Sequence, residues 1–173
     1  MYPQEYIEFL IHFHGDRDYF ECHEILEDYW KDIDPGNKDS IWVGLILLAV
    51  STYHHRRGNF KGAKRTLEKA IKIVQSHNAI LPRLGFKESD FIHLLDSRLR
   101  MIESNQTYFS FSLPITDPQL IELCLNTCHQ QGFEWGKDSD LTNDHLIHRH
   151  KLRDRTSVIE ERNRILLAKK GSK

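Results

Sequence analysis

Apolar residues recur at helical spacing along most of the chain, most clearly over residues 19–33 and 41–58. At 100° per residue, the first of these stretches carries one wide apolar stripe, with Glu21 and Asp28 directed away from it toward solvent. The stripe consists of Tyr19, Cys22, Leu26, Tyr29, Trp30 and Ile33. The second stretch is apolar on every side over residues 41–50, which is typical of a helix buried all round.

Further helices are predicted over residues 3–14, 60–77, 89–103 and 118–131, each bounded by turn or capping residues. Asp16 or Asp18, Asn59 and Asp117 stand at N-cap positions, and Gly58 stands at a helix C-terminus. The pattern therefore predicts an all-α fold, in which a single bundle of five or six helices surrounds a buried central helix and no substantial sheet forms.

Two segments depart from this pattern. Residues 108–115 alternate apolar and polar side chains with a period of two, and we interpret them as extended chain laid over the bundle. Residues 143–169 are rich in Arg, Lys and His and are predicted to form one final helix, whose narrow apolar seam is made of Val158, Ile159, Ile165 and Leu166. We therefore divide the chain into a bundle domain, 1–142, and a peripheral or partner-facing C-terminal helix, 143–173.

Composition narrows the class of protein. The chain has 173 residues, 28% of them charged and 39% hydrophobic, and a formal net charge of −1, which makes nucleic acid an unfavourable partner. It contains no run of about 20 apolar residues, so no membrane partner is expected. Three cysteines and an N-terminus without signal-peptide features indicate a cytoplasmic protein.

The candidate chemistry lies at the edge of the first stripe. His23 and Glu27 stand one helical turn apart, and His54 follows in the polar end of the predicted central helix. Two imidazoles and a carboxylate suit one divalent transition metal, which could activate water for hydrolysis. The order His-Glu-x-x-Glu differs from the His-Glu-x-x-His of zinc proteases. Glu24 and Arg57 complete the catalytic candidates, and His55 lies near them in the pattern.

Three interpretations of this cluster stay open. It is a metal site, a binding or catalytic site without metal, or a buried hydrogen-bond network that fixes helix register. Arg57 and Asn59 precede the predicted third helix and could bind an anion at its N-terminus, although a simple pair of caps in a tight helical turn is the favoured explanation.

The residues of the two central helices also resemble a known family, domain of unknown function 309. Its pattern is aromatic-Glu-x-His-Glu-x-x-Glu-x-x-Trp, then Gly-Leu-Ile, then His-x-x-x-Gly-Asn-x-x-Gly-Ala. These positions are Phe20, Glu21, His23, Glu24, Glu27 and Trp30, then Gly44, Leu45 and Ile46, then His54, Gly58, Asn59, Gly62 and Ala63. The resemblance covers roughly residues 18–72, implies an all-helical fold and brings no established activity with it.

The remaining candidates favour structural roles or partners. Cys124 and Cys128 share a face with apolar residues and are expected to be buried thiols, while His145, His148 and His150 are expected on a solvated face. A tetratricopeptide-like hairpin over residues 53–70 keeps a non-catalytic scaffold open as an alternative function. A protein partner or a second copy is expected to bind through the C-terminal helix.

Overall fold

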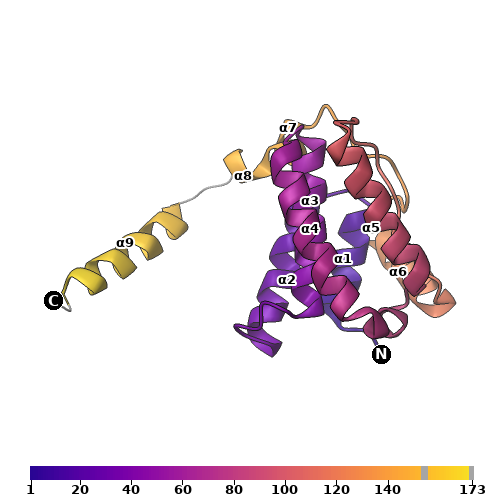
Figure 1. The fold of residues 1–173 in the computed structure, drawn as a ribbon, viewed down its shortest axis with the longest axis horizontal. Coiled ribbons are helices and arrows are strands. Elements are labelled where there is room, and N and C mark those ends of the chain that lie inside the picture. The colour runs from indigo at the N-terminus through magenta and orange to yellow at the C-terminus, as the bar shows by residue number, and fades with distance from the viewer. Residues whose placement is uncertain (153–155, 172–173) are drawn as a thin grey trace.

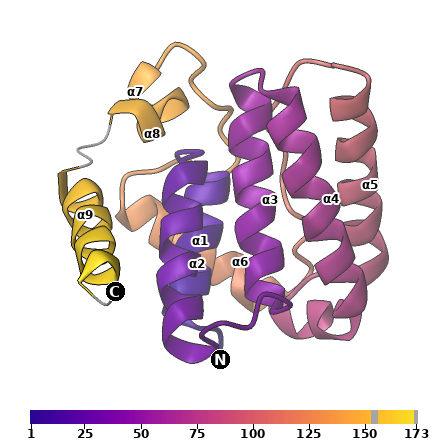
Figure 2. The ribbon, with the colours of Figure 1, turned by 60° about the vertical axis from the view of Figure 1, so that its left-hand side comes forward.

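The helix predicted to lie at the centre of the bundle runs from Ile41 to Arg56 (α3). In the computed structural model it lies between α2 (Tyr19–Ile33) and α4 (Phe60–Ser76) (Figure 2). The structure describes residues 1–152 and 156–171. Within them, α1 (Gln4–His14), α5 (Glu88–Glu103) and α6 (Pro118–Gln130) complete one bundle of helices (Figure 1). A 3₁₀ helix, η1 (Asn78–Leu84), leads from α4 to α5. The predicted all-α bundle is confirmed.

α3 packs most extensively against α4 and α2. Gly44 permits the close approach of α4, since a Cβ atom at that position would lie 3.2 Å from Cγ2 of Ile73. The prediction that α3 is buried on every side is wrong in one respect. Trp42, Val43, Leu47 and Val50 are only partly buried, because no helix in the described part of the chain covers that side of α3 along its whole length.

The predicted caps are confirmed where side chains accept backbone N–H groups. Asp18 accepts from Glu21 at the start of α2, and Asn59 accepts from Gly62 at the start of α4. Gly58 adopts φ +75°, so it ends α3 in the left-handed region that glycine enters without strain. α2 and α3 pack side by side, so the C-terminal end of α3 lies close to the N-terminal end of α2, where the rings of Phe20 and Tyr53 are 5.8 Å apart.

Residues 108–115 are extended, as predicted, and Phe86 and Ile115 form the one isolated β-bridge within the described residues. The predicted alternation does not fix which side chains are buried. Tyr108 is buried and Phe109 is 57% exposed, because the Tyr108 hydroxyl bonds that of Tyr19 inside the bundle, whereas Phe109 covers the guanidinium of Arg98.

The prediction of one continuous helix over residues 143–169 is wrong. The segment forms α7 (Asp144–Ile147), α8 (Arg149–Leu152) and α9 (Thr156–Lys170). We call residues 144–152 the strap, because α7 and α8 lie against the bundle, and α9 extends away from it (Figure 1). Contacts of the strap with α2 and α3, described below, override the helical tendency of the sequence. The division of the chain at residue 142 stays a prediction.

Candidate functional site

His23 and Glu27, the first two residues of the predicted cluster, meet on the surface of α2. The Nδ1 atom of His23 lies 2.9 Å from the carbonyl oxygen of Phe20, and its Nε2 atom lies 3.2 Å from Oε2 of Glu27 and 3.7 Å from Oε1 of Glu24. Lys31 lies 2.7 Å from the other oxygen of Glu27. Partial burial acts to raise the pKa of Glu27, but Lys31 and His23 outweigh it and hold the pKa below its ordinary value.

A small pocket lies beside this ion-pair cluster, between α2, α3 and α8, with a volume of about 160 Å³. Its lining residues are Tyr19, Phe20, His23, Val50, Tyr53, His54, Arg57 and His150. The structure therefore brings His23 and His54 to one cavity. Glu24 and Glu27 do not line it, so the predicted triad of His23, Glu27 and His54 is divided between the pocket and the outer surface of α2.

Asn59 fixes the orientation and the hydrogen position of the His54 ring. The Oδ1 atom of Asn59 accepts the N–H of Gly62, which leaves its amide nitrogen 3.2 Å from Nδ1 of His54. Because an amide nitrogen only donates, Nδ1 of His54 accepts and Nε2 carries the hydrogen. Burial lowers the pKa of His54, and the charges of Arg57 and Arg65 lower it further. His54 is thus a neutral donor.

Tyr53 and His150 form a second hydrogen-bonded pair in the pocket. The Tyr53 hydroxyl accepts the backbone N–H of His150 at 3.1 Å and lies 2.6 Å from the Nδ1 atom of the same residue. We assign the phenolic hydrogen to the bond with Nδ1, which leaves Nε2 of His150 as the protonated nitrogen. Burial, followed by the charge of Arg57, lowers the pKa of His150 to about 4. The prediction that His150 lies on a solvated face is wrong.

Arg57 supplies the only side chain in the pocket that is charged at every pH of interest. Its guanidinium carbon lies 5.2 Å from the ring centroid of Tyr53, and its buried Nε atom has no hydrogen-bond partner within the described residues. No carboxylate is among the residues that line the pocket. The pocket therefore presents hydrogen-bond donors and a cation without a negative group to balance them.

The strap closes the pocket through contacts that are distant in sequence. Arg149 bonds the carboxylates of Asp18 and Glu21, and its guanidinium lies 5.4 Å from the ring centroid of Phe20. Arg56 donates to the carbonyl oxygen of Leu146 at 3.2 Å. Glu21, predicted to face solvent, is thus an anchor of the strap.

The comparisons with known proteins extend the resemblance seen in the sequence. Residues 6–66 match the family described as Domain of unknown function (DUF309). The protein named Uncharacterized protein YpuF of Bacillus subtilis (strain 168) is 45% identical over 173 residues, which are 100% of this chain and 99% of that protein. The chain belongs to this family. No solved structure matches it.

The DUF309 match begins within α1 and ends within α4, so it contains Tyr53, His54 and Arg57 but leaves out His150 and the strap. Sequence reasoning missed Tyr53 and His150 as pocket residues. Tyr53 reads as an ordinary core aromatic, and His150 lies 97 residues further along the chain in a charged segment without clear periodicity.

Other residues of this DUF309 protein that the sequence pattern singled out lie outside the pocket and make structural contacts. His55 does not reach the pocket, because its Nε2 atom bonds the carbonyl oxygen of Gln106 and its Nδ1 atom accepts from Arg98. Cys124 and Cys128 are buried free thiols, as expected. Within the described ranges 1–152 and 156–171, no group of three or more His, Cys, Asp or Glu side chains has a geometry that could hold a metal ion. No helix in these ranges is long and apolar enough to cross a membrane.

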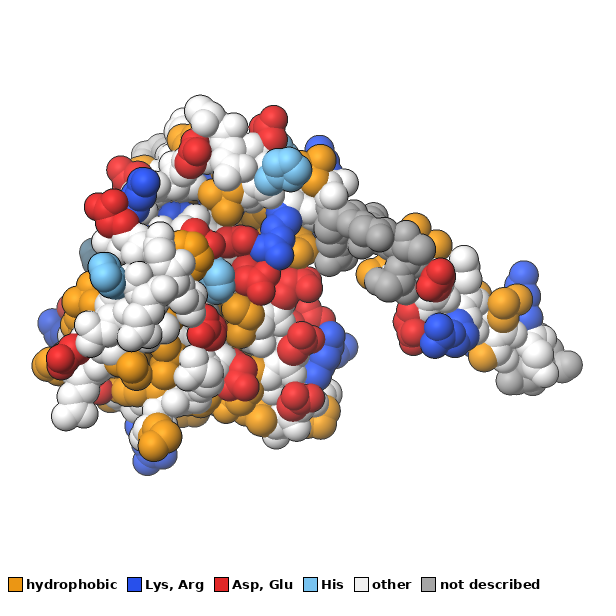
Figure 3. Space-filling model, turned by 180° about the vertical axis from the view of Figure 1, so that it is seen from behind, with side chains coloured by type: hydrophobic (Ala, Val, Ile, Leu, Met, Phe, Trp, Pro, Cys, Tyr) orange, Lys and Arg blue, Asp and Glu red, His pale blue; other side chains and the backbone are white. Residues whose placement is uncertain are grey.

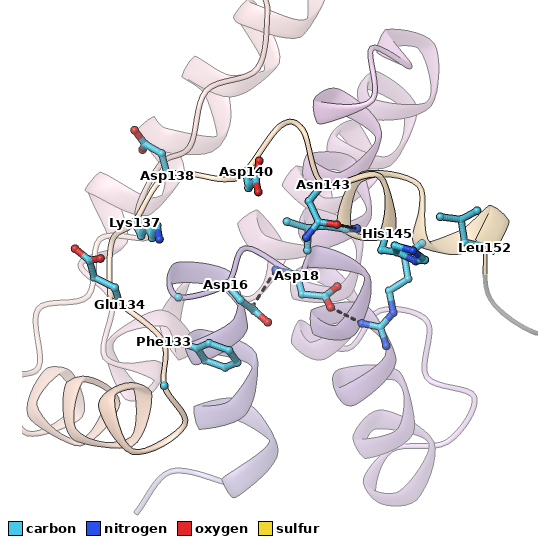
Figure 4. Close-up of a pocket in the computed structure, with 14 residues that line it drawn as sticks. Asp16, Asp18, Phe133, Glu134, Lys137, Asp138, Asp140, Asn143, His145 and Leu152 are labelled. Atoms are coloured by element: carbon cyan, nitrogen blue, oxygen red, sulfur yellow. Dashed lines mark hydrogen bonds and ion pairs between the residues drawn. The ribbon is translucent and has the colours of Figure 1, made fainter.

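A larger hollow, of about 690 Å³, lies on the other side of the strap. We call it the acidic groove, because the carboxylates of Asp16, Asp18, Glu134, Asp138 and Asp140 line it. Figure 3 shows acidic side chains gathered on this face of the bundle, and Figure 4 shows Asp16 and Asp18 across from the loop that carries Glu134 to Asp140. Phe133, Leu146 and Leu152 add apolar surface. No sequence motif indicated this groove.

Proposed function

We propose that the protein binds a small organic anion in the pocket between α2, α3 and α8. The observation that carries this proposal is the set of unbalanced donors: Arg57, His54 and His150 line one cavity to which no carboxylate contributes. Burial in such a cavity strengthens the attraction between a guanidinium and an anion, since water screens it less. The unpartnered Nε atom of Arg57 supports the same conclusion.

The size and the walls of the pocket indicate what the anion carries. Tyr19, Phe20 and Val50 supply apolar surface, and the volume of about 160 Å³ is close to the engineered cavities of about 150 Å³ that hold benzene. The ligand class that fits is a carboxylate or phosphate attached to a compact apolar group. A cytoplasmic location is part of the proposal, supported by three unpaired cysteines.

The metal hypothesis has weaker support from the same geometry. Metal ligation by His54 would require Nδ1 to give up the Asn59 amide, or Nε2 to lose its hydrogen. Glu27 would have to leave Lys31 and turn into the pocket. Anion binding requires neither change, because His54 keeps its bond to Asn59 and Glu27 keeps its pair with Lys31.

Titration with benzoate, isobutyrate and inorganic phosphate, followed by NMR and calorimetry, tests the proposal. At least one carboxylate should shift the resonances of Tyr53, His54 and His150, and Arg57→Gln should weaken its binding about tenfold or more, since a charge-assisted hydrogen bond contributes about 1.5–3 kcal/mol. The matched control is Arg65→Gln, which removes an equal charge near His54 from an exposed position outside the pocket.

Two results would overturn the proposal. One is equal affinity of Arg57→Gln and the parent protein for every anion that binds. The other is a stoichiometric transition metal in untagged protein that disappears in His23→Ala and His54→Ala, which would favour the metal hypothesis instead.

A further inference from the structure

α9 carries apolar side chains that nothing within the described residues covers. Val158, Ile159, Ile165 and Leu166 are between 43% and 52% exposed, and Figures 1 and 3 both show α9 extending away from the bundle. An isolated helix of 15 residues is marginal in water, because few backbone hydrogen bonds offset the cost of nucleation. The exposed face therefore requires a partner surface.

The two acidic side chains of α9 lie together on one side of the helix, with Arg164 beside them. At 100° per residue, the four apolar residues share one face of about 140° with Arg162, Lys169 and Lys170, whereas Glu160 and Glu161 fall outside it. The face is thus apolar and cationic, with no acidic side chain. A surface that complements it must combine apolar contacts with carboxylates.

We propose that this face of α9 docks into the acidic groove of a second copy of the chain. The groove offers the required combination, since Phe133, Leu146 and Leu152 supply apolar contacts and the five carboxylates outnumber the cations Lys137 and Arg149. Arg149 is already paired with Asp18 and Glu21, and Asp140 accepts from Thr142, so Glu134 and Asp138 stay available to the cations of α9. Complementary charges of this kind orient one surface on another and speed association.

Reciprocal exchange explains why a second copy is the occupant. When each copy inserts α9 into the groove of the other, two equivalent dockings form around one two-fold axis. Such a dimer buries twice the surface of a single docking, whereas α9 pairing with α9 alone would bury only one narrow seam. A stable interface needs on the order of 1,200 Å² of total buried surface, which favours the exchange of both helices.

The first test changes α9 within the full-length chain. The parent protein should sediment as a dimer across a dilution series, and Ile165→Asp should weaken dimerisation at least about tenfold, because a buried carboxylate replaces an apolar contact. The matched control is Leu167→Asp, which lies about 160° from Ile165 on the helix and is 69% exposed, and it should leave the dimer intact. A parent protein that is monomeric at every concentration, including one whose α9 folds into its own groove, overturns the proposal.

The second test changes the receiving surface. The double variant Glu134→Lys, Asp138→Lys should lose the dimer, whereas Asp28→Lys, Asp32→Lys, with the same change of net charge on the exposed face of α2, should keep it. If the groove variant dimerises like its control, α9 binds elsewhere and the proposal is wrong. The residues concerned do not line the anion pocket, so failure of this proposal leaves the proposed function standing, and the reverse also holds.

Discussion

The pocket lined by His54, Arg57 and His150 and the acidic groove share the strap as a common wall, yet one is lined by a cation without a carboxylate and the other mainly by carboxylates. His150 of the strap lines the pocket, and Arg149 next to it lines the groove. Arg149 is neutralised by Asp18 and Glu21, so the remaining carboxylates dominate the groove, whereas Arg57 has no such partner in the pocket. The net charge of each cavity therefore depends on which of its charged side chains are already paired. The formal net charge of −1 for the whole chain gives no sign of either local excess.

Acidification should destabilise the packing that supports the loop of the acidic groove. His14, which is fully buried, supports the groove loop: its carbonyl oxygen accepts the N–H of Gly136, its ring stacks on Trp135 at 4.2 Å, and its Nε2 atom accepts the N–H of Leu113. Burial lowers its pKa to about 4. As pH falls, His14 takes up a proton in the unfolded chain, near pH 6.5, before it does so in the folded protein. Protonation therefore favours unfolding, and the free energy of unfolding should fall by about 3 kcal/mol between about pH 6.5 and 4.

Urea denaturation at a series of pH values measures this loss. His14→Phe keeps the stacking on Trp135 but removes the titrating ring, so it should be less stable at neutral pH and should lose the share of the pH dependence that His14 contributes, while His150 keeps its own. The control is His93→Asn at an exposed position, which should retain the full dependence. An unchanged pH profile in His14→Phe would assign the effect to other groups.

Loosening the strap should affect both cavities at once. Arg149→Ala removes the bonds to Asp18 and Glu21, and since the side chain of Arg149 is 37% exposed we expect a cost of only about 1 kcal/mol, confined to the strap. Hydrogen exchange should speed up over residues 144–152 and stay unchanged in α3. Lys151→Ala, two residues further along the strap and exposed, is the matched control. Equal exchange in the two variants would show that Arg149 does not hold the strap.

The smallest effect is expected for Glu27, which lies outside both cavities. Glu27→Gln should reduce the free energy of unfolding by a few tenths of a kcal/mol, because its pairs with His23 and Lys31 are partly exposed. It should leave anion affinity within about twofold of the parent value, in contrast to the loss of about tenfold in Arg57→Gln. An affinity loss as large as that of Arg57→Gln would place Glu27 in the site.

Local patterns were sufficient to predict much of this architecture. The stripe on α2, the caps at Asp18 and Asn59 and the apolar α3 each follow from neighbouring residues, and they bring His23 and His54 to one cavity. What could not be predicted depends on contacts between distant segments. The place of the strap against α2 follows from Arg149 meeting Asp18 and Glu21, and the role of His150 follows from Tyr53, 97 residues earlier.

The 97 residues between Tyr53 and His150 also set the order in which parts of the molecule fold during synthesis. The ribosome delivers α1 to α4 first, and these helices contact one another locally, so they can pack while the rest of the chain is still being made. The Tyr53 hydroxyl cannot bond to His150 until that residue has left the ribosome. A nascent chain therefore passes through a stage in which the pocket lacks its α8 wall, and only a complete strap supplies that wall.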